Sequence, residues 1–177
     1  MTTSDTLDAF GKLVAPDTLR IERLMPGPID RVWSYLIDGD KRRKWLAAGE
    51  MPQAPGGEFT LTWRNDELTS PPGARPDGFS TEHSMKSRVV EMQPPHRLVF
   101  TWGEAGEVSI DLVPEGDRVH LTLVHTRIAE RPARIMIGAG WHAHLDVLAA
   151  RLGGDDCAPF WDTWQRLRAE YDARLPG

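Results

Sequence analysis

Cysteine and long hydrophobic runs are the two features that this sequence most clearly lacks. Cys157 is the only cysteine among 177 residues, so the chain can form no internal disulfide bond and no cysteine-rich metal site. No stretch reaches the roughly 18 consecutive apolar residues of a membrane-spanning helix. The first residues also lack the basic and apolar regions of a secretion signal. We therefore expect a cytoplasmic protein with no membrane insertion.

Positive charge is outnumbered by negative charge. The sequence has 21 lysines and arginines against 26 aspartates and glutamates, a net charge of −5, whereas nucleic-acid binding depends on clustered positive charge. We expect no nucleic-acid partner, and we interpret the basic run at residues 41–44 as a solvated surface. The hydrophobic content of 40% and the charged content of 27% are typical of one globular domain.

The remaining pattern predicts strands in the middle of the chain and helices on either side of them. Alternating apolar residues predict six strands, at 18–25, 58–64, 81–93, 97–102, 107–113 and 118–126. The short, turn-rich connections between most of them favour an antiparallel sheet with one buried face. Helical spacing predicts two short helices after the first strand, at 28–37 and 39–47, and two later ones, at 141–152 and around 160–171. The last helix is expected to pack one face inward, with Phe160, Trp164, Leu167 and Tyr171 on that face.

The helix at 141–152 is the most informative element. Glycines bracket it at 138–140 and 153–154. Its apolar residues Trp141, Leu145, Leu148 and Leu152 recur at i, i+4, i+7 and i+11, which places them on one face. Because the helix follows the strands, we expect it to cover the apolar face of the sheet and to leave a pocket between them.

These elements divide the chain into three parts. Residues 1–17 form a loose N-terminal leader with a turn of helix around 7–13, residues 18–152 form the main domain, and residues 153–177 form a helical extension packed on it. The segment at 65–80 is rich in proline and glycine and is long for a loop inside a compact domain. It is either a lid over the mouth of the pocket or a disordered segment.

Seven segments, in this order, carry a resemblance to a known family. They are IER at 21–23, PIDRVW at 28–33, RKWL at 43–46, GGEF at 56–59, PPHRLVFTW at 94–102, LTLVHT at 121–126 and GWHAHL at 140–145. The chain resembles the START/SRPBCC helix-grip superfamily, and within it the branch named for the activator of the heat-shock protein 90 ATPase. The resemblance covers about 18–152. It implies an α+β fold in which a curved antiparallel sheet wraps around a long C-terminal helix, with an apolar cavity between them.

The resemblance leaves the function more open than the fold, because one fold can serve many functions. We expect a protein that binds a small hydrophobic or aromatic molecule between the sheet and the long helix. One alternative is a polyketide cyclase or dehydratase that uses His83 or His125 as an acid or base, although no catalytic motif is recognisable. Another is a protein-interaction or co-chaperone-like module. The eukaryotic activators carry a further domain that docks on the chaperone, and residues 1–17 are too short for it. We therefore expect no chaperone partner, and a homodimer stays open.

Twelve residues are candidates for the ligand site because their strand or helix faces point toward the expected pocket. They are Trp63, His83, Met85, Phe100, Trp102, Ile110, Leu123, His125, Trp141, His144, Leu145 and Leu148. Such pockets are mainly apolar with a few polar anchors. A neutral imidazole could hydrogen-bond a ligand there, although each histidine could equally be an ordinary core or rim residue.

The two helix histidines are predicted to face different ways. His142 and His144 are two residues apart, about 200° around the helix axis, so they cannot bind one metal ion together. We expect His144 beside the pocket and His142 facing outward next to Asp146. A zinc site built from His83, His125 and His144 is a further alternative. It lacks an accompanying carboxylate or thiol, so we expect no metal site, and we also expect no cofactor.

Overall fold

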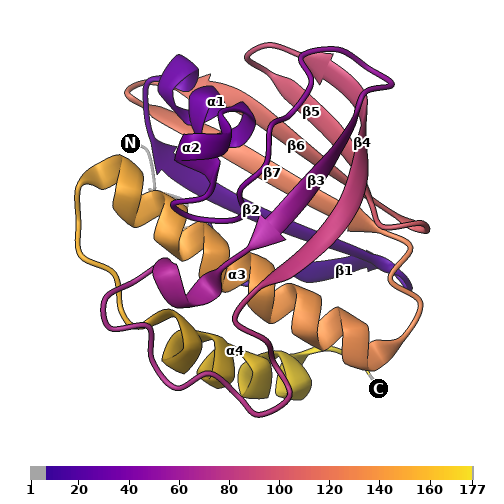
Figure 1. Cartoon of the computed structure of the whole chain (residues 1–177), viewed down its shortest axis with the longest axis vertical. Helices are drawn as coiled ribbons and strands as arrows, with labels where there is room; N and C mark the ends of the chain where they lie inside the picture. The colour runs from indigo at the N-terminus through magenta and orange to yellow at the C-terminus, as the bar shows by residue number, and fades with distance from the viewer. Residues whose placement is uncertain (1–6, 177) are drawn as a thin grey trace, which may run out of the picture.

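The computed structural model describes residues 7–176, so residues 1–6 of the expected leader lie outside the described part. Seven strands form one curved antiparallel sheet in the order β1-β2-β7-β6-β5-β4-β3 (Figure 1). The strands are β1 (Lys12–Ala15), β2 (Thr18–Pro26), β3 (Glu58–Trp63), β4 (His83–Gln93), β5 (Arg97–Trp102), β6 (Gly106–Glu115) and β7 (Arg118–Thr126). The helices are α1 (Ile29–Ile37), α2 (Gly39–Arg42), α3 (Arg131–Gly153) and α4 (Phe160–Arg174), with a 3₁₀ turn, η1, at Asn65–Glu67.

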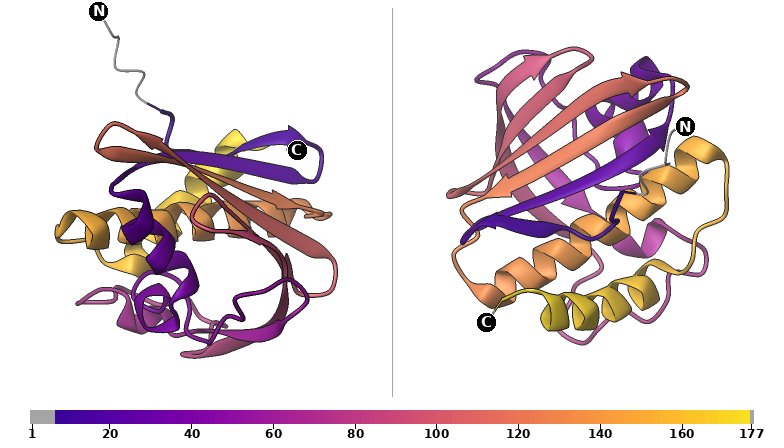
Figure 2. Two further views of the ribbon diagram at one scale, coloured as in Figure 1. Left: turned by 90° about the horizontal axis from the view of Figure 1, so that it is seen from above. Right: turned by 180° about the vertical axis from the view of Figure 1, so that it is seen from behind.

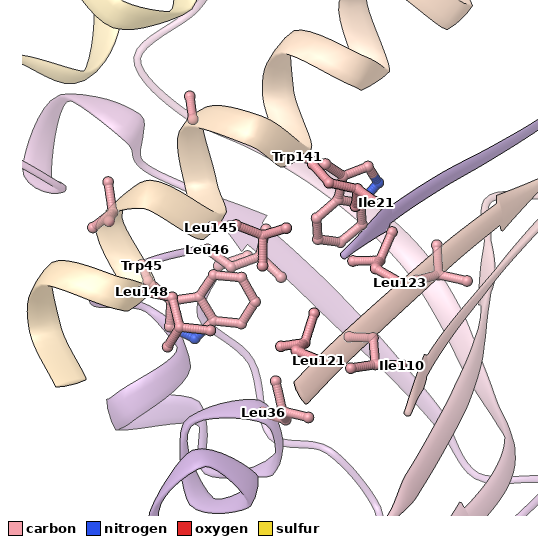
Figure 3. Close-up of a cluster of buried hydrophobic side chains, with 14 of the residues drawn as sticks. Ile21, Leu36, Trp45, Leu46, Ile110, Leu121, Leu123, Trp141, Leu145 and Leu148 are labelled. Carbon is pink, nitrogen blue, oxygen red and sulfur yellow. The ribbon is translucent and has the colours of Figure 1, made fainter. Parts of the chain in front are cut away.

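The sheet curves around α3, as the view from above shows (Figure 2). One row of side chains on the central strands faces this helix, because the register pairs Ile21 of β2 with Leu123 of β7 and Leu123 with Ile110 of β6. Trp141 and Leu145 of α3 point toward that row (Figure 3), and both are buried. The expected α+β helix-grip fold, with a sheet gripping a long C-terminal helix, is confirmed.

The long helix differs from its prediction in length and in burial. It begins at Arg131, well before the glycines that were expected to bracket it. Pro132 fits its first turn because the backbone N–H that proline lacks would have no partner there. All five residues from Trp141 to Leu145 are buried, since α4 covers the side of α3 that faces away from the sheet (Figure 2). The prediction of a single buried face was therefore wrong.

The second short helix ends earlier than predicted. α2 stops at Arg42, not at residue 47. The Arg42 side chain is buried and donates hydrogen bonds to the carbonyl oxygens of Leu36 at 3.0 Å, Ala47 at 3.1 Å and Gly49. These bonds tie the following residues back against the helix, and burial lowers the pKa of Arg42 to about 10. The basic run is thus not wholly a solvated surface.

At the two ends, the structure adds packing that the sequence patterns did not specify. Lys12–Ala15 forms the edge strand β1, paired with β2, in place of the expected turn of helix around 7–13. In α4, Trp164, Leu167 and Tyr171 are buried, as their helical spacing predicted. The Tyr171 hydroxyl accepts a hydrogen bond from the Gly11 N–H at 2.7 Å. The N-terminal segment and the last helix are therefore joined.

Candidate functional site

A cavity of about 390 Å³ opens between the sheet, α3, α4 and the loop after β3. Its volume lies in the range of small-molecule sites. The sheet supplies Trp63, His83, Met85 and Trp102. Helix α3 supplies Met136, Ile137, Gly140, Trp141 and His144, and α4 supplies Phe160, Trp161 and Trp164. The connecting segments add Leu46, Asn65, Gly78, Phe79 and Ser80.

Aromatic rings form most of this wall. Five of the seven tryptophans of the chain line the cavity. On the sheet side, the Trp102 ring centre lies 5.4 Å from that of Trp63 and 5.3 Å from that of Trp141. On the α4 side, Phe79 of the loop packs edge-on against Trp164 with 5.1 Å between ring centres. Such contacts hold broad, rigid aromatic surfaces in place.

The cavity wall carries no aspartate, glutamate, lysine or arginine among its described residues. A charged group transferred from water into such surroundings would lose its hydration without gaining an ion-pair partner, at a large cost in free energy. The cavity is therefore suited to uncharged molecules.

His125 lies behind the aromatic wall and holds part of it in position. It is buried, and its Nδ1 accepts a hydrogen bond from the indole N–H of Trp141 at 3.0 Å. Burial lowers the pKa of His125 to about 4, so the ring is neutral at pH 7. The remaining proton of the ring is then on Nε2. His125 does not line the cavity, but it contacts two residues that do, Trp141 through this hydrogen bond and Trp102 through an edge-on ring contact of 5.0 Å.

His144 lines the cavity and is fixed from behind. Its Nδ1 lies 2.8 Å from the backbone carbonyl oxygen of Trp45, and its ring packs against Phe160 with 4.9 Å between ring centres. Burial lowers the pKa of His144 to about 4, although the hydrogen bond to Trp45 opposes this effect. A neutral imidazole is therefore held at one place on the wall.

The candidate residue His83 and His142, which was not a candidate, occupy different surroundings. His83 begins β4 at the cavity edge, where its side chain is exposed and lies near Trp63. His142 does not face outward as predicted, because Phe10 and Tyr171 cover it. The Tyr171 hydroxyl and His142 Nδ1 share a hydrogen bond of 3.0 Å, and burial is the main cause that lowers the pKa of His142 to about 3.

The structure thus divides the twelve candidate residues into two groups. Trp63, His83, Met85, Trp102, Trp141 and His144 line the cavity together. The others are buried residues that do not themselves line this cavity. They are Phe100, Ile110, Leu123, His125, Leu145 and Leu148.

The α4 side of the cavity was not foreseen from the sequence. The spacing of Phe160 and Trp164 predicts a buried helix face, but spacing alone does not say which surface that face meets. Trp161 lies outside that stripe, and it is buried because the loop after β3 covers it. The nearby prolines and glycines of this loop indicated an irregular segment without indicating its partner.

Hydrogen bonds tie that loop to the start of α4. The Phe160 N–H donates to the Thr69 hydroxyl at 2.9 Å, and the Trp161 N–H donates to the Pro72 carbonyl at 2.9 Å. The first N–H groups of a helix have no acceptor within the helix, and here the loop supplies acceptors for two of them. The indole N–H of Trp161 also donates to Asp66 at 2.7 Å. The loop and α4 therefore close one side of the cavity as a single unit.

Two further observations concern residues 7–176. No group of three or more histidine, cysteine, aspartate or glutamate side chains is arranged to hold a metal ion. No helix in that part of the chain is long and apolar enough to cross a membrane.

Comparisons with known proteins agree with this architecture. The family model described as "Activator of Hsp90 ATPase homolog 1-like protein" matches residues 26–153. The solution structure of the protein encoded by gene BPP1335 from Bordetella parapertussis is 38% identical, with a TM-score of 0.79, and the match covers 100% of this chain and 97% of that one. CalU16 from Micromonospora echinospora is 23% identical, with a TM-score of 0.63 over 88% of this chain and 86% of that one. Curated protein sequences gave no match.

Proposed function

Because the chain belongs to the family of activator of Hsp90 ATPase homolog 1-like proteins, with its START/SRPBCC helix-grip fold, we propose that it binds a small, uncharged aromatic or apolar molecule. The ligand would occupy the cavity between the sheet, α3 and α4. The observation that carries this proposal is the cavity wall itself, in which five tryptophans and two phenylalanines surround a space without charged side chains. A flat apolar ligand would bury its surface there and leave no charge unpaired.

The histidines favour binding over acid–base catalysis. An efficient general base has a pKa near the working pH, whereas the pKa values of His125 and His144 are both lowered to about 4. The Nδ1 atom of His125 is in addition occupied by the Trp141 indole. Of the three candidate histidines, only His83 is exposed to solvent, at the cavity edge. This arrangement supports a carrier or sensor of a neutral molecule more than a cyclase or dehydratase.

The loop after β3 acts in this proposal as a lid, and the C-terminal extension belongs to the same binding unit. Phe79 and Ser80 of the loop border the cavity together with Trp161 and Trp164 of α4. A ligand could enter if this unit separated from α3 near Met136, whose side chain lines the cavity and is 39% exposed.

A cavity-filling variant tests the proposal. Gly140 lies on the cavity wall, and a β-carbon added there would have only Trp164 Nε1 within reach, at 4.0 Å. The Gly140→Leu variant should therefore fold and occupy part of the cavity. Native mass spectrometry of the wild-type protein with a panel of neutral aromatic compounds should show one-to-one complexes that this variant does not form.

The matched control is Gly116→Asn, a change at a turn with open space around it. Asparagine tolerates the positive φ of 63° at this position. This control should form the same complexes as the wild-type protein. Equal complex formation by the wild-type protein and by Gly140→Leu, or none by either, would contradict the proposal.

A further inference from the structure

The hydrogen bond behind His144 determines which of its ring nitrogens carries the proton. The Trp45 carbonyl oxygen can only accept a hydrogen bond, so His144 Nδ1, 2.8 Å away, must be the donor. A neutral imidazole has one N–H group, and here it is on Nδ1. His144 Nε2 therefore carries a lone pair and can only accept.

Within the described residues, the His144 ring makes its hydrogen bond through Nδ1, and Nε2 has no hydrogen-bond partner. Three described side-chain atoms are both fully buried and unpartnered, namely Asn65 Oδ1, Ser87 Oγ and Arg134 Nε. His144 Nε2 also lacks a partner but is not among these three atoms. It is therefore not fully buried itself, although the residue as a whole is buried. The atom must therefore border open space, and the open space that His144 lines is the cavity.

Three elements hold the ring in this orientation. The chain after α2 supplies the Trp45 carbonyl, α3 carries the side chain, and α4 packs the Phe160 ring against it. Turning the ring would break the bond to Trp45 and leave a carbonyl oxygen unpaired in the core, which is costly. The acceptor is therefore preorganised at a defined place on a mainly apolar wall.

We infer that the ligand is a flat aromatic molecule with a neutral hydrogen-bond donor, of which an aromatic hydroxyl group is the simplest form, and that this donor binds His144 Nε2. This inference rests on the binding function proposed above and specifies the class of ligand. A molecule whose polar groups are all acceptors, such as a ketone or an ether, would meet the lone pair of Nε2 without forming a bond. His144 then acts in selecting the ligand, and the tryptophans supply most of the contact surface.

Two probes of nearly the same shape separate the donor from the apolar contact. 2-Naphthol carries a hydroxyl donor, and 2-fluoronaphthalene has no hydrogen-bond donor. Their dissociation constants can be measured by calorimetry on the wild-type protein and on His144→Phe, which keeps a ring and removes both nitrogens. The preference for 2-naphthol should fall about fivefold in His144→Phe, as expected for the loss of one neutral hydrogen bond.

His96→Phe is the matched control. His96 also has Nδ1 near a backbone carbonyl oxygen, that of Leu112 at 3.2 Å, and it does not line the cavity. This variant should keep the wild-type preference. An unchanged preference in His144→Phe would overturn the inference while leaving the binding function in place. If neither probe binds to the wild-type protein, the proposed function fails and the inference fails with it.

A measurement on the unmodified chain keeps the test valid if His144→Phe does not fold. Long-range ¹H–¹⁵N spectra distinguish the two nitrogens of each histidine and show which one is protonated. We expect His144 to be protonated on Nδ1, and its Nε2 signal to shift toward the hydrogen-bonded value with 2-naphthol but not with 2-fluoronaphthalene. Protonation on Nε2, or equal shifts with both probes, would overturn the inference.

Discussion

Trp141 on α3 donates its indole N–H to Nδ1 of His125 on β7 across 3.0 Å. The bond joins the gripped helix to the sheet at the edge of the cavity, and both residues are buried. It explains how a histidine that does not line the cavity can still affect it, because the orientation of the Trp141 ring depends on this acceptor.

The first prediction concerns the stability that this pair contributes. Trp141→Phe leaves His125 Nδ1 without a donor, and His125→Leu leaves the indole N–H without an acceptor. Each change should lower the free energy of unfolding by about 1–3 kcal/mol. Urea unfolding of the double variant should show a loss smaller than the sum of the single losses by about 1 kcal/mol. Combining Trp141→Phe with His96→Phe should give additive losses. Additive losses for Trp141→Phe with His125→Leu would show that the bond contributes nothing specific.

Two glycines on α3 should respond in opposite ways to the same substitution. A β-carbon at Gly138 would lie 3.0 Å from Cδ1 of Tyr171, and that ring cannot move freely because its hydroxyl bonds both Gly11 and His142. Gly138→Ala should therefore destabilise the protein by about 1–3 kcal/mol. At Gly140 the space is open, so Gly140→Ala should stabilise the helix by up to about 1 kcal/mol. Thermal unfolding measures both, and equal shifts of the melting temperature would contradict the packing of α4 on α3.

Stability should fall as the pH drops below neutral. Burial lowers the pKa of His125 to about 4, of His142 to about 3 and of His144 to about 4, from an ordinary value of 6.5. The unfolded chain therefore binds more protons than the folded one as the pH falls through about 6.5. The contribution of these histidines to the free energy of unfolding is fully present above that pH and is lost progressively toward pH 4. Down to pH 4, each histidine can account for a loss of about 3 kcal/mol.

Urea unfolding between pH 7.5 and pH 5 measures this dependence. The slope of the free energy of unfolding against pH should decrease in His142→Phe, because one titrating group is removed. It should stay the same in Val113→Ala, a change at an exposed position that removes no titrating group. A free energy of unfolding that does not change over this range would show that the histidines are not buried in the neutral form.

The lid should loosen when its turn is strained. Gly73 has a φ of 85°, and a β-carbon there would lie 2.9 Å from the Asp162 nitrogen at the start of α4. Gly73→Ala should therefore weaken the contact between the loop and α4 and speed hydrogen exchange at the Phe160 and Trp161 amides. Gly116→Ala, with a φ of 63° at a turn with open space around it, should leave those two amides unchanged. If hydrogen exchange at these two amides is unaltered in Gly73→Ala, the contact between the loop and α4 does not depend on this turn, and the loop does not act as the proposed lid.

Local patterns predicted the elements better than the contacts between them. Alternation in β2 to β7 placed the strands, and the spacing of Trp141 and Leu145 placed the helix that they grip. The same spacing could not show that α4 would cover the opposite side of α3, so His142 was assigned to the surface. Burial of Arg42 depends on carbonyl groups that gather only when the chain after α2 turns back. The periodicity of a sequence does not identify such long-range partners. About half of the residues that line the cavity belong to α4 and to the connecting segments, whose positions depend on contacts of this kind.

The indole N–H signals of the seven tryptophans test the binding account most directly. In ¹H–¹⁵N spectra recorded during a titration with 2-naphthol, the signals of the five cavity tryptophans should move together to saturation, namely those of Trp63, Trp102, Trp141, Trp161 and Trp164. The signals of Trp33 and Trp45, which do not line this cavity, should stay in place. Stationary signals for all seven, or movement confined to Trp33 and Trp45, would contradict the account.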